Sequence, residues 1–431
     1  MKDLLILCPT PRERRNLPKL AERIGVNLRF DEFGGDYFDD LLGDNPKLDS
    51  KPLDIAKLLD ETVQRHYDDK IAGITSGVGY PGMSATAVLS ERLDLPGPKP
   101  NPILLCEHKY YCRVRQAKIV PSATPNFHLI DPNNLESIES ISMFPGFLKP
   151  VKSCMSKNAF RIKDLGELRS RAKECLLPEL FILPFNDLVR MYTDWNLKAN
   201  FLLYEDLLEG MQVSLEGFVY QGQVTVMGII DAIMFPDTFS FKRFQYPSSL
   251  PEDVLLRMEQ IASEFITGIG YDNAMFNMEM MYNPKKDTVH IIEINPKIAS
   301  QFPDLFEKVD GSNSYEVMMR IALGLEPNFV RGCGKYKIAA SCVLRTFEDK
   351  LVTEIPDQEN IDAVEKQFPD SIVQVIATKG KKLSEQLQDS YSFRYGLINM
   401  GADSQEELVQ NFEKASDMLN FKLEPVYAKH T

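Results

Sequence analysis

The sequence predicts a chain of α/β and α+β parts, and three observations support this fold class. Short apolar strands alternate with amphipathic helices through about the first hundred residues, which is typical of a parallel sheet covered by helices. Alternating runs at 213–234 and a β-hairpin at 277–297 indicate an antiparallel sheet. The residues from about 335 onward combine strands with a helix and suggest a small α+β lobe.

Length and composition limit the classes of function. A chain of 431 residues is long enough for about two to four domains, and 44% hydrophobic residues can fill sizeable cores. The net charge of −13 argues against a nucleic-acid partner, which usually needs a basic face. Seven scattered cysteines without a CxxC pair fit reduced thiols and a cytoplasmic location. No apolar run approaches the roughly 18 residues of a membrane span, so no membrane association is expected.

In the N-terminal part, a loop rich in glycine follows the third predicted strand. Strands are expected at 3–8, 27–30 and 71–75, and helices at 17–24, 53–67 and 84–93. The loop 76–82 contains Gly77, Gly79 and Gly82. Ligands of parallel sheets bind beyond the carboxyl ends of the strands, and N–H groups near a helix N-terminus suit an anion. The alternative is a plain tight turn.

Two segments in the middle of the chain carry cationic side chains. A predicted helix presents Lys109, Arg113 and Arg115, although a charged helical face is usually only solvated. Lys149 lies near the end of the predicted strand FPGFLKPV. The small polar loop 152–159 that follows can close over phosphates, or it can be an ordinary loop.

The hairpin at 277–297 presents two glutamates on one face. Its two apolar runs flank a cluster of turn residues. With the turn centred on Lys286, the facing pairs are Glu279 with Glu293, Asn277 with Asn295, Met278 with Ile294 and Met280 with Ile292. Like charges directly opposite each other destabilise a sheet, and a hard divalent cation is the simplest compensation. The alternative is a solvated face with two harmless glutamates.

The remaining segments complete the predicted elements. Helices are expected at 250–267, 315–323 and 405–419, and strands at 336–346 and 373–378. Arg345 and Arg394 lie in the C-terminal part. They could reach a substrate, but a surface or structural role is the better interpretation.

Five segments, taken in order, give the chain a resemblance to a known superfamily. These are LDLPGP with the later His108-Lys109, FPGFLKP, YEDLLEGMQVSLEGFVYQG, MEMMYNPKKDTVHIIEINPK and VDGSNSYEVMMRIALG. Together they resemble the ATP-grasp ligases, which include amino-acid ligases, biotin carboxylase and D-alanine–D-alanine ligase. The matches cover roughly residues 70 to 330.

The resemblance implies a fold and a reaction. The ATP-grasp fold has an N-terminal Rossmann-like parallel sheet, a nucleotide-binding lid, a central antiparallel sheet and a small C-terminal lobe. These parts would span 1–120, 121–200, 201–334 and 335–431. The implied activity is an ATP-dependent ligase that joins a small amino-acid-like carboxylate to an amine through an acyl-phosphate. ADP and phosphate would be released, Mg²⁺ (or Mn²⁺ in its place) would be required, and a homodimer is compatible with this class.

The resemblance also implies roles for particular residues. Metal ligands would be Glu279, Glu293 and Asn295. Phosphate contacts would come from Lys109 and Lys149, with Ser156 in the lid loop. The adenine slot would be lined by Glu205, Asp206 and Leu208, mostly through backbone groups. Lys297 would face the acyl-phosphate, where arginine is usual.

Three departures from the family pattern concern the nucleotide and the substrate. The ribose-binding acid aligns with Gln212 or, less well, with Glu209. The lid loop has no glycine between Pro150 and Arg161. At position 297 a lysine offers a point charge where an arginine offers a planar fork.

Two other functions remain open at this stage. One is an ATP-dependent carboxylase that activates bicarbonate, although no biotin-attachment lysine between methionines is present. The other is a non-catalytic nucleotide-binding regulator, against which the Glu279, Glu293 and Asn295 set argues.

Overall fold

The computed structural model describes residues 2–42, 51–154, 157–238, 240–386, 388 and 392–426. Its contacts divide the chain into two compact units. The first comprises Met1–Met227, Leu250–Ser300 and Tyr315–Asn328, and the second Gly228–Ser249, Gln301–Ser314 and Phe329–Thr431. The four-part division expected from the sequence remains a prediction.

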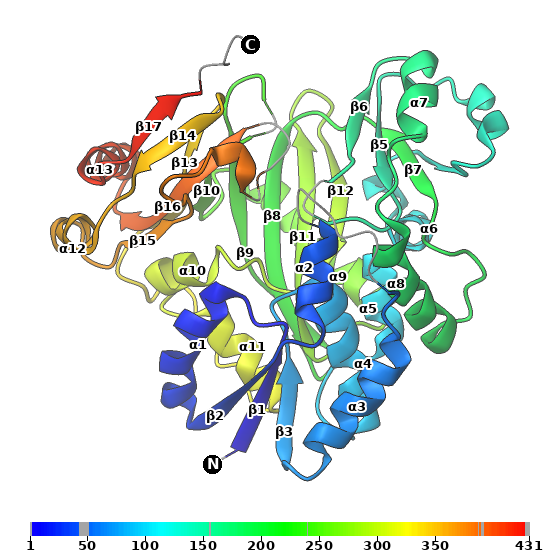
Figure 1. The fold of residues 1–431 in the computed structure, drawn as a ribbon, viewed down its shortest axis with the longest axis horizontal. Helices are drawn as coiled ribbons and strands as arrows, with labels where there is room; N and C mark the ends of the chain where they lie inside the picture. The colour runs from blue at the N-terminus through cyan, green and yellow to red at the C-terminus, as the bar shows by residue number, and fades with distance from the viewer. Residues whose placement is uncertain are drawn as a thin grey trace. The chain divides into compact units, whose positions relative to one another are not determined.

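The first unit begins with the predicted parallel sheet, in the order β2-β1-β3 (Figure 1). Its strands are β1 (Lys2–Leu7), β2 (Val26–Asp31) and β3 (Ile71–Thr75). The accompanying helices are α1 (Pro11–Ile24), α2 (Gly35–Leu42), α3 (Ile55–Tyr67), α4 (Ser84–Arg92), α5 (Pro100–Glu107) and α6 (Lys109–Ile119). Helix α1 begins earlier than the predicted residue 17, because Thr10 caps it and Pro11 is tolerated in a first helical turn.

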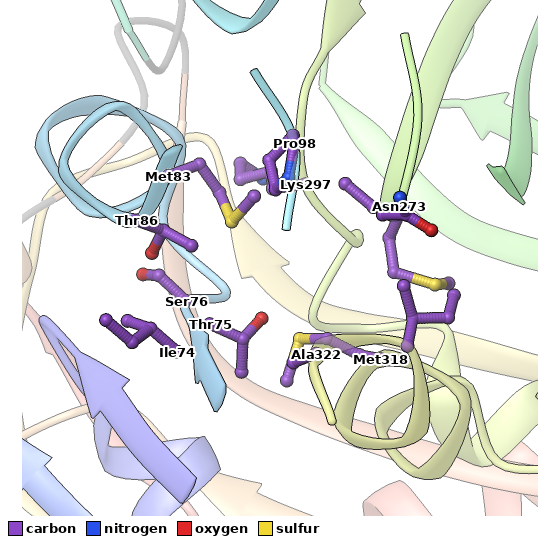
Figure 2. A pocket seen from close by; sticks show the side chains of 13 residues that line it. Ile74, Thr75, Ser76, Met83, Thr86, Pro98, Asn273, Lys297, Met318 and Ala322 are labelled. Atoms are coloured by element: carbon purple, nitrogen blue, oxygen red, sulfur yellow. The ribbon is translucent and has the colours of Figure 1, made fainter. Parts of the chain in front are cut away.

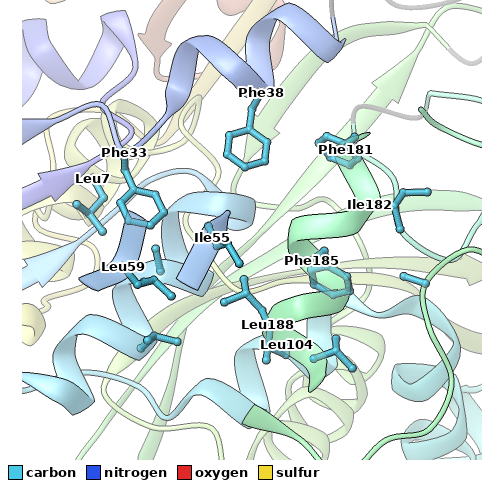
Figure 3. Close-up of a cluster of buried hydrophobic side chains, with 14 of the residues drawn as sticks. Leu7, Phe33, Phe38, Ile55, Leu59, Leu104, Phe181, Ile182, Phe185 and Leu188 are labelled. Carbon is cyan, nitrogen blue, oxygen red and sulfur yellow. The ribbon is translucent and has the colours of Figure 1, made fainter. Parts of the chain in front are cut away.

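A large apolar core joins this parallel sheet to helix α8 (Glu179–Tyr192). Phe181 and Phe185 of α8 pack in one buried cluster with Phe33 and Leu59 (Figure 3). Helix α8 falls within the range 121–200 expected for the lid, and its apolar face belongs to the same core as β1 and β3.

The next sheet of the first unit is four-stranded and antiparallel, in the order β4-β7-β5-β6. Its strands are β4 (Phe127–Ile130), β5 (Gly146–Pro150), β6 (Phe160–Ile162) and β7 (Leu202–Asp206), and helix α7 is Leu165–Ala172. The register pairs Lys149 with Leu203 and Phe147 with Glu205. Lys149 is therefore a diagonal neighbour of Glu205, within reach of a long side chain.

A second antiparallel sheet of the first unit runs in the order β12-β11-β8 and continues into the beginning of β9. Its strands are β8 (Met211–Tyr220), β9 (Gln223–Met234), β11 (Ala274–Asn283) and β12 (Thr288–Asn295). Helices α9 (Glu252–Gly268) and α11 (Ser314–Ala322) are close to their predicted ranges. The Asn283 side chain accepts the N–H groups of Lys285 and Lys286 and so builds the hairpin turn.

The register of the hairpin confirms three of the four predicted pairs. Glu279 faces Glu293, Asn277 faces Asn295 and Met278 faces Ile294. The fourth pair is wrong. Met280 faces Ile291, not Ile292, because a β-bulge shifts the register immediately after the glutamate pair.

The second unit contains the rest of β9 and an antiparallel sheet in the order β9-β10-β13-β16-β15. Its strands are β10 (Phe241–Tyr246), β13 (Ile338–Thr346), β15 (Ile372–Val375) and β16 (Phe393–Ala402), with the separate pair β14 (Lys350–Glu354) and β17 (Lys422–Pro425). Its helices are α10 (Pro303–Asp310), α12 (Gln358–Gln367) and α13 (Gln405–Met418). The sequence predicts β13, β15 and α13 but not β10, β14, β16, β17, α10 or α12.

Two further observations concern the expectations for this part of the chain. Arg345 lies opposite Arg394 in the β13–β16 register, and its guanidinium donates to Ser392 Oγ. This contact lies inside the second unit and agrees with a structural role for Arg345. Among the described residues, no helix is both long and apolar enough to cross a membrane.

Candidate active site

The polar face of the hairpin brings two carboxylates together on adjacent strands. Glu279 of β11 lies opposite Glu293 of β12. Glu279 accepts hydrogen bonds from Gln212 Nε2 at 3.0 Å and Asn295 Nδ2 at 3.5 Å. Burial, followed by the neighbouring charge of Glu293, raises the pKa of Glu279 to about 7. The predicted metal ligands are therefore gathered on one face.

Lys109, the first residue of α6, lies beside this face. Its Nζ is 3.4 Å from Glu293 Oε2 and donates to the Ser153 carbonyl at 3.2 Å. Burial alone would raise the pKa of Glu293, but the positive charges of Lys109 and Lys149 hold it below its ordinary value. Lys109 therefore compensates one of the two carboxylates and links it to the loop that follows β5.

Lys149 lies in a second, fully paired cluster. Its Nζ is 2.6 Å from Glu205 Oε2, and Arg113 Nε is 2.5 Å from Glu205 Oε1. Despite burial, these two cations lower the pKa of Glu205 to about 2, whereas burial lowers the pKa of Lys149. Arg113 is only 2% exposed. Its interpretation as part of a solvated helical face is therefore wrong.

The other residues predicted to bind nucleotide lie near the end of β7 and the start of β8. Asp206 accepts hydrogen bonds from the backbone and side chain of Asn126. Leu208 is half-buried in the connection that follows β7, and Glu209 is exposed. Gln212 is bound to Glu279, on the carboxylate face. Ser156 lies outside the described residues.

Lys297 follows β12 and lines a small recess that is partly open to solvent. Its Nζ donates to the Ile298 carbonyl at 3.3 Å. Figure 2 shows Met83 and Thr86 entering the recess from η1 (Gly79–Met83) and α4, and Met318 entering from α11. The remaining lining is mostly apolar, so Lys297 is the charged group of this recess.

The glycine loop after β3 packs against carboxylates of the chain itself. A Cβ on Gly77 would lie 2.3 Å from Glu13 Oε1, and a Cβ on Gly79 would lie 2.3 Å from Glu107 Oε1. Only glycine permits such close approach. Because carboxylates lie against both positions, the structure does not favour an external anion at Gly77 and Gly79.

Sequence reasoning missed a buried ion pair next to the lid loop. Lys152 is 1% exposed and pairs with Glu107. Its Nζ also lies 4.5 Å from the ring centroid of Tyr80 and 4.7 Å from that of Phe185. Burial lowers the pKa of Lys152. The sequence offered only a second lysine three residues after Lys149, which carries little signal.

The carboxylate face fits Mg²⁺ by the chemistry of its donors. Magnesium is usually held by one or two carboxylates together with waters and substrate phosphates, rather than by a full protein cage. Glu279 and Glu293 supply two carboxylates, and Asn295 supplies an amide oxygen. Within the part of the chain that the structure describes, no cluster of three or more His, Cys, Asp or Glu side chains could hold a metal. A metal at this face would therefore depend on phosphate oxygens for further ligands.

Comparisons with known proteins give a match in structure only. No family model matches the chain, and no curated protein sequence matches it. The L-amino acid ligase from Bacillus licheniformis superposes with a TM-score of 0.75 at 18% identity, covering 99% of both chains. Phosphoribosylglycinamide synthetase from Anaerococcus prevotii gives a TM-score of 0.66 at 16% identity, covering 98% of this chain and 100% of that one.

A carboxylase is also among the similar structures. The biotin carboxylase domain of the Hydrogenobacter thermophilus 2-oxoglutarate carboxylase, solved with MgADP and bicarbonate, gives a TM-score of 0.65 at 15% identity. It covers 98% of this chain and 91% of that one. The chain therefore has the fold of these ligases, which is the ATP-grasp fold predicted from the sequence.

Proposed function

We propose that this chain is an ATP-dependent ligase that joins a small amino-acid-like carboxylate to an amine. The reaction would pass through an acyl-phosphate and release ADP and phosphate. The observation that carries this proposal is the opposed pair Glu279 and Glu293, which lies next to Asn295 and has Lys109 at 3.4 Å from Glu293. The near-complete coverage of an L-amino acid ligase by this fold supports the substrate class.

The first step needs positive charge around the transferring phosphoryl group. The substrate carboxylate would attack the γ-phosphate in line, and negative charge would spread over the phosphoryl oxygens. Lys109 would contact those oxygens, because its Nζ already lies beside the carboxylate face. Glu279, Glu293 and Asn295 would hold Mg²⁺, which when bound would supply positive charge against the developing charge of the phosphoryl group.

Lys149 would reach the phosphates from the end of β5. In the structure it is paired with Glu205, so it would share its three N–H donors between Glu205 and a phosphate. Glu205, Asp206 and Leu208 would line the adenine slot through backbone groups. The loop 152–159 would exclude water from the acyl-phosphate.

The second step is attack of the amine on the acyl carbon, with phosphate as the leaving group. Lys297 would stabilise the oxyanion or the acyl-phosphate as a point charge. Its place in a mostly apolar recess supports this role, because an apolar lining screens a charge less than water does.

The reaction is tested by nucleotide analysis with pairs of amino acids. Purified protein with Mg-ATP is incubated with amino-acid pairs, and ADP, AMP and phosphate are separated and measured. We expect ADP and phosphate in equal amounts, with no AMP. Replacing the amine with hydroxylamine should trap the acyl-phosphate as a hydroxamate.

The Glu279→Gln variant is the matched control, because it removes one charged oxygen ligand and keeps the shape of the side chain. It should lose turnover with every substrate pair. AMP and pyrophosphate as main products would contradict the acyl-phosphate route. The absence of any Mg-ATP binding would contradict the function as a whole.

The carboxylase is retained as a second candidate, because one of the similar structures was solved with bicarbonate and MgADP. It predicts that ADP release depends on bicarbonate and not on an amino acid. The same assay, with and without bicarbonate in degassed buffer, separates the two reactions. A homodimer and a cytoplasmic location remain predictions.

A further inference from the structure

The β-bulge in the hairpin lies directly beside the proposed metal ligands. Glu293 pairs with Glu279, but the next pair along the ladder is Ile291 with Met280. Ile292 is therefore the extra residue on β12. A bulge leaves the extra residue outside the regular ladder and bends the strand locally.

The bulge decides which side chains share a face. In a regular ladder Ile291 would lie on the same face as Glu293, because side chains alternate with a period of two. With the bulge, Ile291 is buried with no exposure and faces the buried Met280, while Glu293 still faces Glu279. The bulge thus allows β12 to contribute Ile291 to the core without turning the glutamate away.

A buried arginine from α6 binds the carbonyl of the bulged residue. Arg113 Nη2 donates to the Ile292 carbonyl at 2.6 Å. The same guanidinium binds Glu205 through Nε at 2.5 Å and donates to Gln116 Oε1 through Nη1. All three nitrogens are therefore used, on acceptors from α6, β7 and β12.

This geometry needs an arginine. A guanidinium presents its donors in a rigid planar fork, whereas a lysine ammonium is a compact point charge on a flexible stem. A lysine at position 113 could pair with Glu205 or reach Ile292, but it could not hold both acceptors in fixed positions. The fork therefore connects the strand that carries Glu293 to the strand that carries Glu205.

We infer that Arg113 is a positioning residue, which holds the bulge at Ile292 and thereby fixes Glu293 opposite Glu279 for metal-bound nucleotide. The inference rests on the proposed function, because it assigns Glu293 to the magnesium site. In this role Arg113 acts through Glu293, because it binds the carbonyl of the neighbouring Ile292. Its contribution should therefore appear in the magnesium-dependent part of nucleotide binding.

The test compares Arg113→Lys with Arg115→Lys. Arg115 lies on the same helix but is exposed, so its substitution is a matched control. Calorimetry measures the affinity for the non-hydrolysable analogue AMP-PNP with Mg²⁺ and, separately, with EDTA. For Arg113→Lys we expect the gain in affinity from Mg²⁺ to fall about tenfold. Binding in EDTA should stay within about twofold of the parent, and Arg115→Lys should change neither.

Hydrogen exchange of the metal-free protein provides a second readout. Peptides covering Thr288–Asn295 should exchange faster in Arg113→Lys than in the parent, because the bulge has lost its bound donor. Gln116→Leu removes one acceptor of the guanidinium and keeps its charge. It should lower the gain in affinity from Mg²⁺ and speed exchange at Thr288–Asn295, each by about twofold. If Arg113→Lys does not fold, this variant tests the inference in its place.

Each other outcome has a defined meaning. An unchanged magnesium gain together with unchanged exchange at Thr288–Asn295 would overturn the inference. An equal loss of affinity with and without Mg²⁺ would also overturn it, because a general structural role produces that result. If the parent shows no magnesium-dependent binding, the proposed function fails, and exchange at the bulge still decides whether Arg113 holds it.

Discussion

The first unit contains two glutamate clusters, and the pKa values of Glu205 in one and of Glu279 in the other are shifted in opposite directions. Glu205 is 4% exposed and lies between Arg113 and Lys149, which lower its pKa to about 2. Glu279 accepts hydrogen bonds from the amides of Gln212 and Asn295 and faces another carboxylate, and its pKa is raised to about 7. Two cations of the protein compensate Glu205, whereas in the other cluster Lys109 compensates Glu293 and Glu279 faces that carboxylate.

The difference separates a cluster that stabilises the fold from the cluster that we propose binds a ligand. A buried charge that is paired and hydrogen-bonded holds elements together, and removing one partner is costly. Two carboxylates that face each other gain nothing from their proximity until a cation lies between them. Mutation of the Glu205 cluster should therefore lower the stability of the protein, whereas mutation of the Glu279 cluster should weaken ligand binding.

The largest expected effect is the loss of protein stability when the Glu205 cluster is disrupted. Glu205→Gln removes the negative charge between two buried cations, so the free energy of unfolding should fall by about 3–5 kcal/mol. Urea unfolding measures it. Glu209→Gln, at an exposed position four residues on, is the control and should stay within about 0.5 kcal/mol of the parent. A loss for Glu205→Gln no larger than that of the control would show that the cluster does not stabilise the fold.

The pH dependence of the same cluster gives the next effect. The folded-state pKa of Glu205, about 2, is depressed below its ordinary value of 4.5. The contribution of ionised Glu205 to the free energy of unfolding is therefore fully present above about pH 4.5. This contribution, up to about 3 kcal/mol, is lost as the pH falls toward 2. The stability difference between the parent and Glu205→Gln should narrow between about pH 5 and pH 3. A difference that stays constant over this range would contradict the assignment.

Mutation of the Glu279 cluster should instead change how strongly Mg-ATP stabilises the protein. Glu279→Gln relieves the repulsion from Glu293, so the protein without nucleotide should be as stable as the parent or slightly more stable. In the parent, Mg-ATP at about 100 times its dissociation constant should add about 2.7 kcal/mol, and this gain should largely disappear in the variant. Thermal melts of both proteins with and without Mg-ATP give all four values. A lower melting temperature without nucleotide, combined with an intact Mg-ATP shift, would identify Glu279 as a structural glutamate.

The smallest expected effect concerns Lys149, which pairs with Glu205 and whose charge also acts on Glu293. Lys149→Ala should weaken ATP binding by about 1.5–3 kcal/mol, the value of one charge-assisted contact. The 2.6 Å pair with Glu205 predicts an additional loss of stability. Lys163→Ala, at an exposed lysine after β6, is the control for both the ATP affinity and the stability. Unchanged ATP affinity in Lys149→Ala would remove this residue from the nucleotide site.

The register of the hairpin was predictable because its determinants are local. The turn residues at 283–287 fix where the chain reverses, and the period of two then places Glu279 opposite Glu293. The prediction failed one pair later, at Met280. The bulge there is bound by Arg113, which lies 179 residues away in sequence, and no local pattern records that contact.

The interpretation of Arg113 failed for the same reason. On a helix, three cations among polar neighbours indicate a solvated face. The acceptor that buries Arg113 is Glu205, 92 residues further along the chain. The glycine loop after β3 is similar, since only the folded chain brings Glu13 and Glu107 against Gly77 and Gly79.

The sequence by itself determined many of the elements, the order of the ATP-grasp segments and the carboxylate pair of the hairpin. These depend on side-chain alternation, helix caps and turn residues, which act within a few positions of one another. Only the tertiary structure decided which charges compensate which. Glu205 is paired with Arg113 and Lys149, while Glu279 is left to face Glu293. Ion pairing depends on distance in space, and the folded chain alone brings such distant residues within a few ångströms.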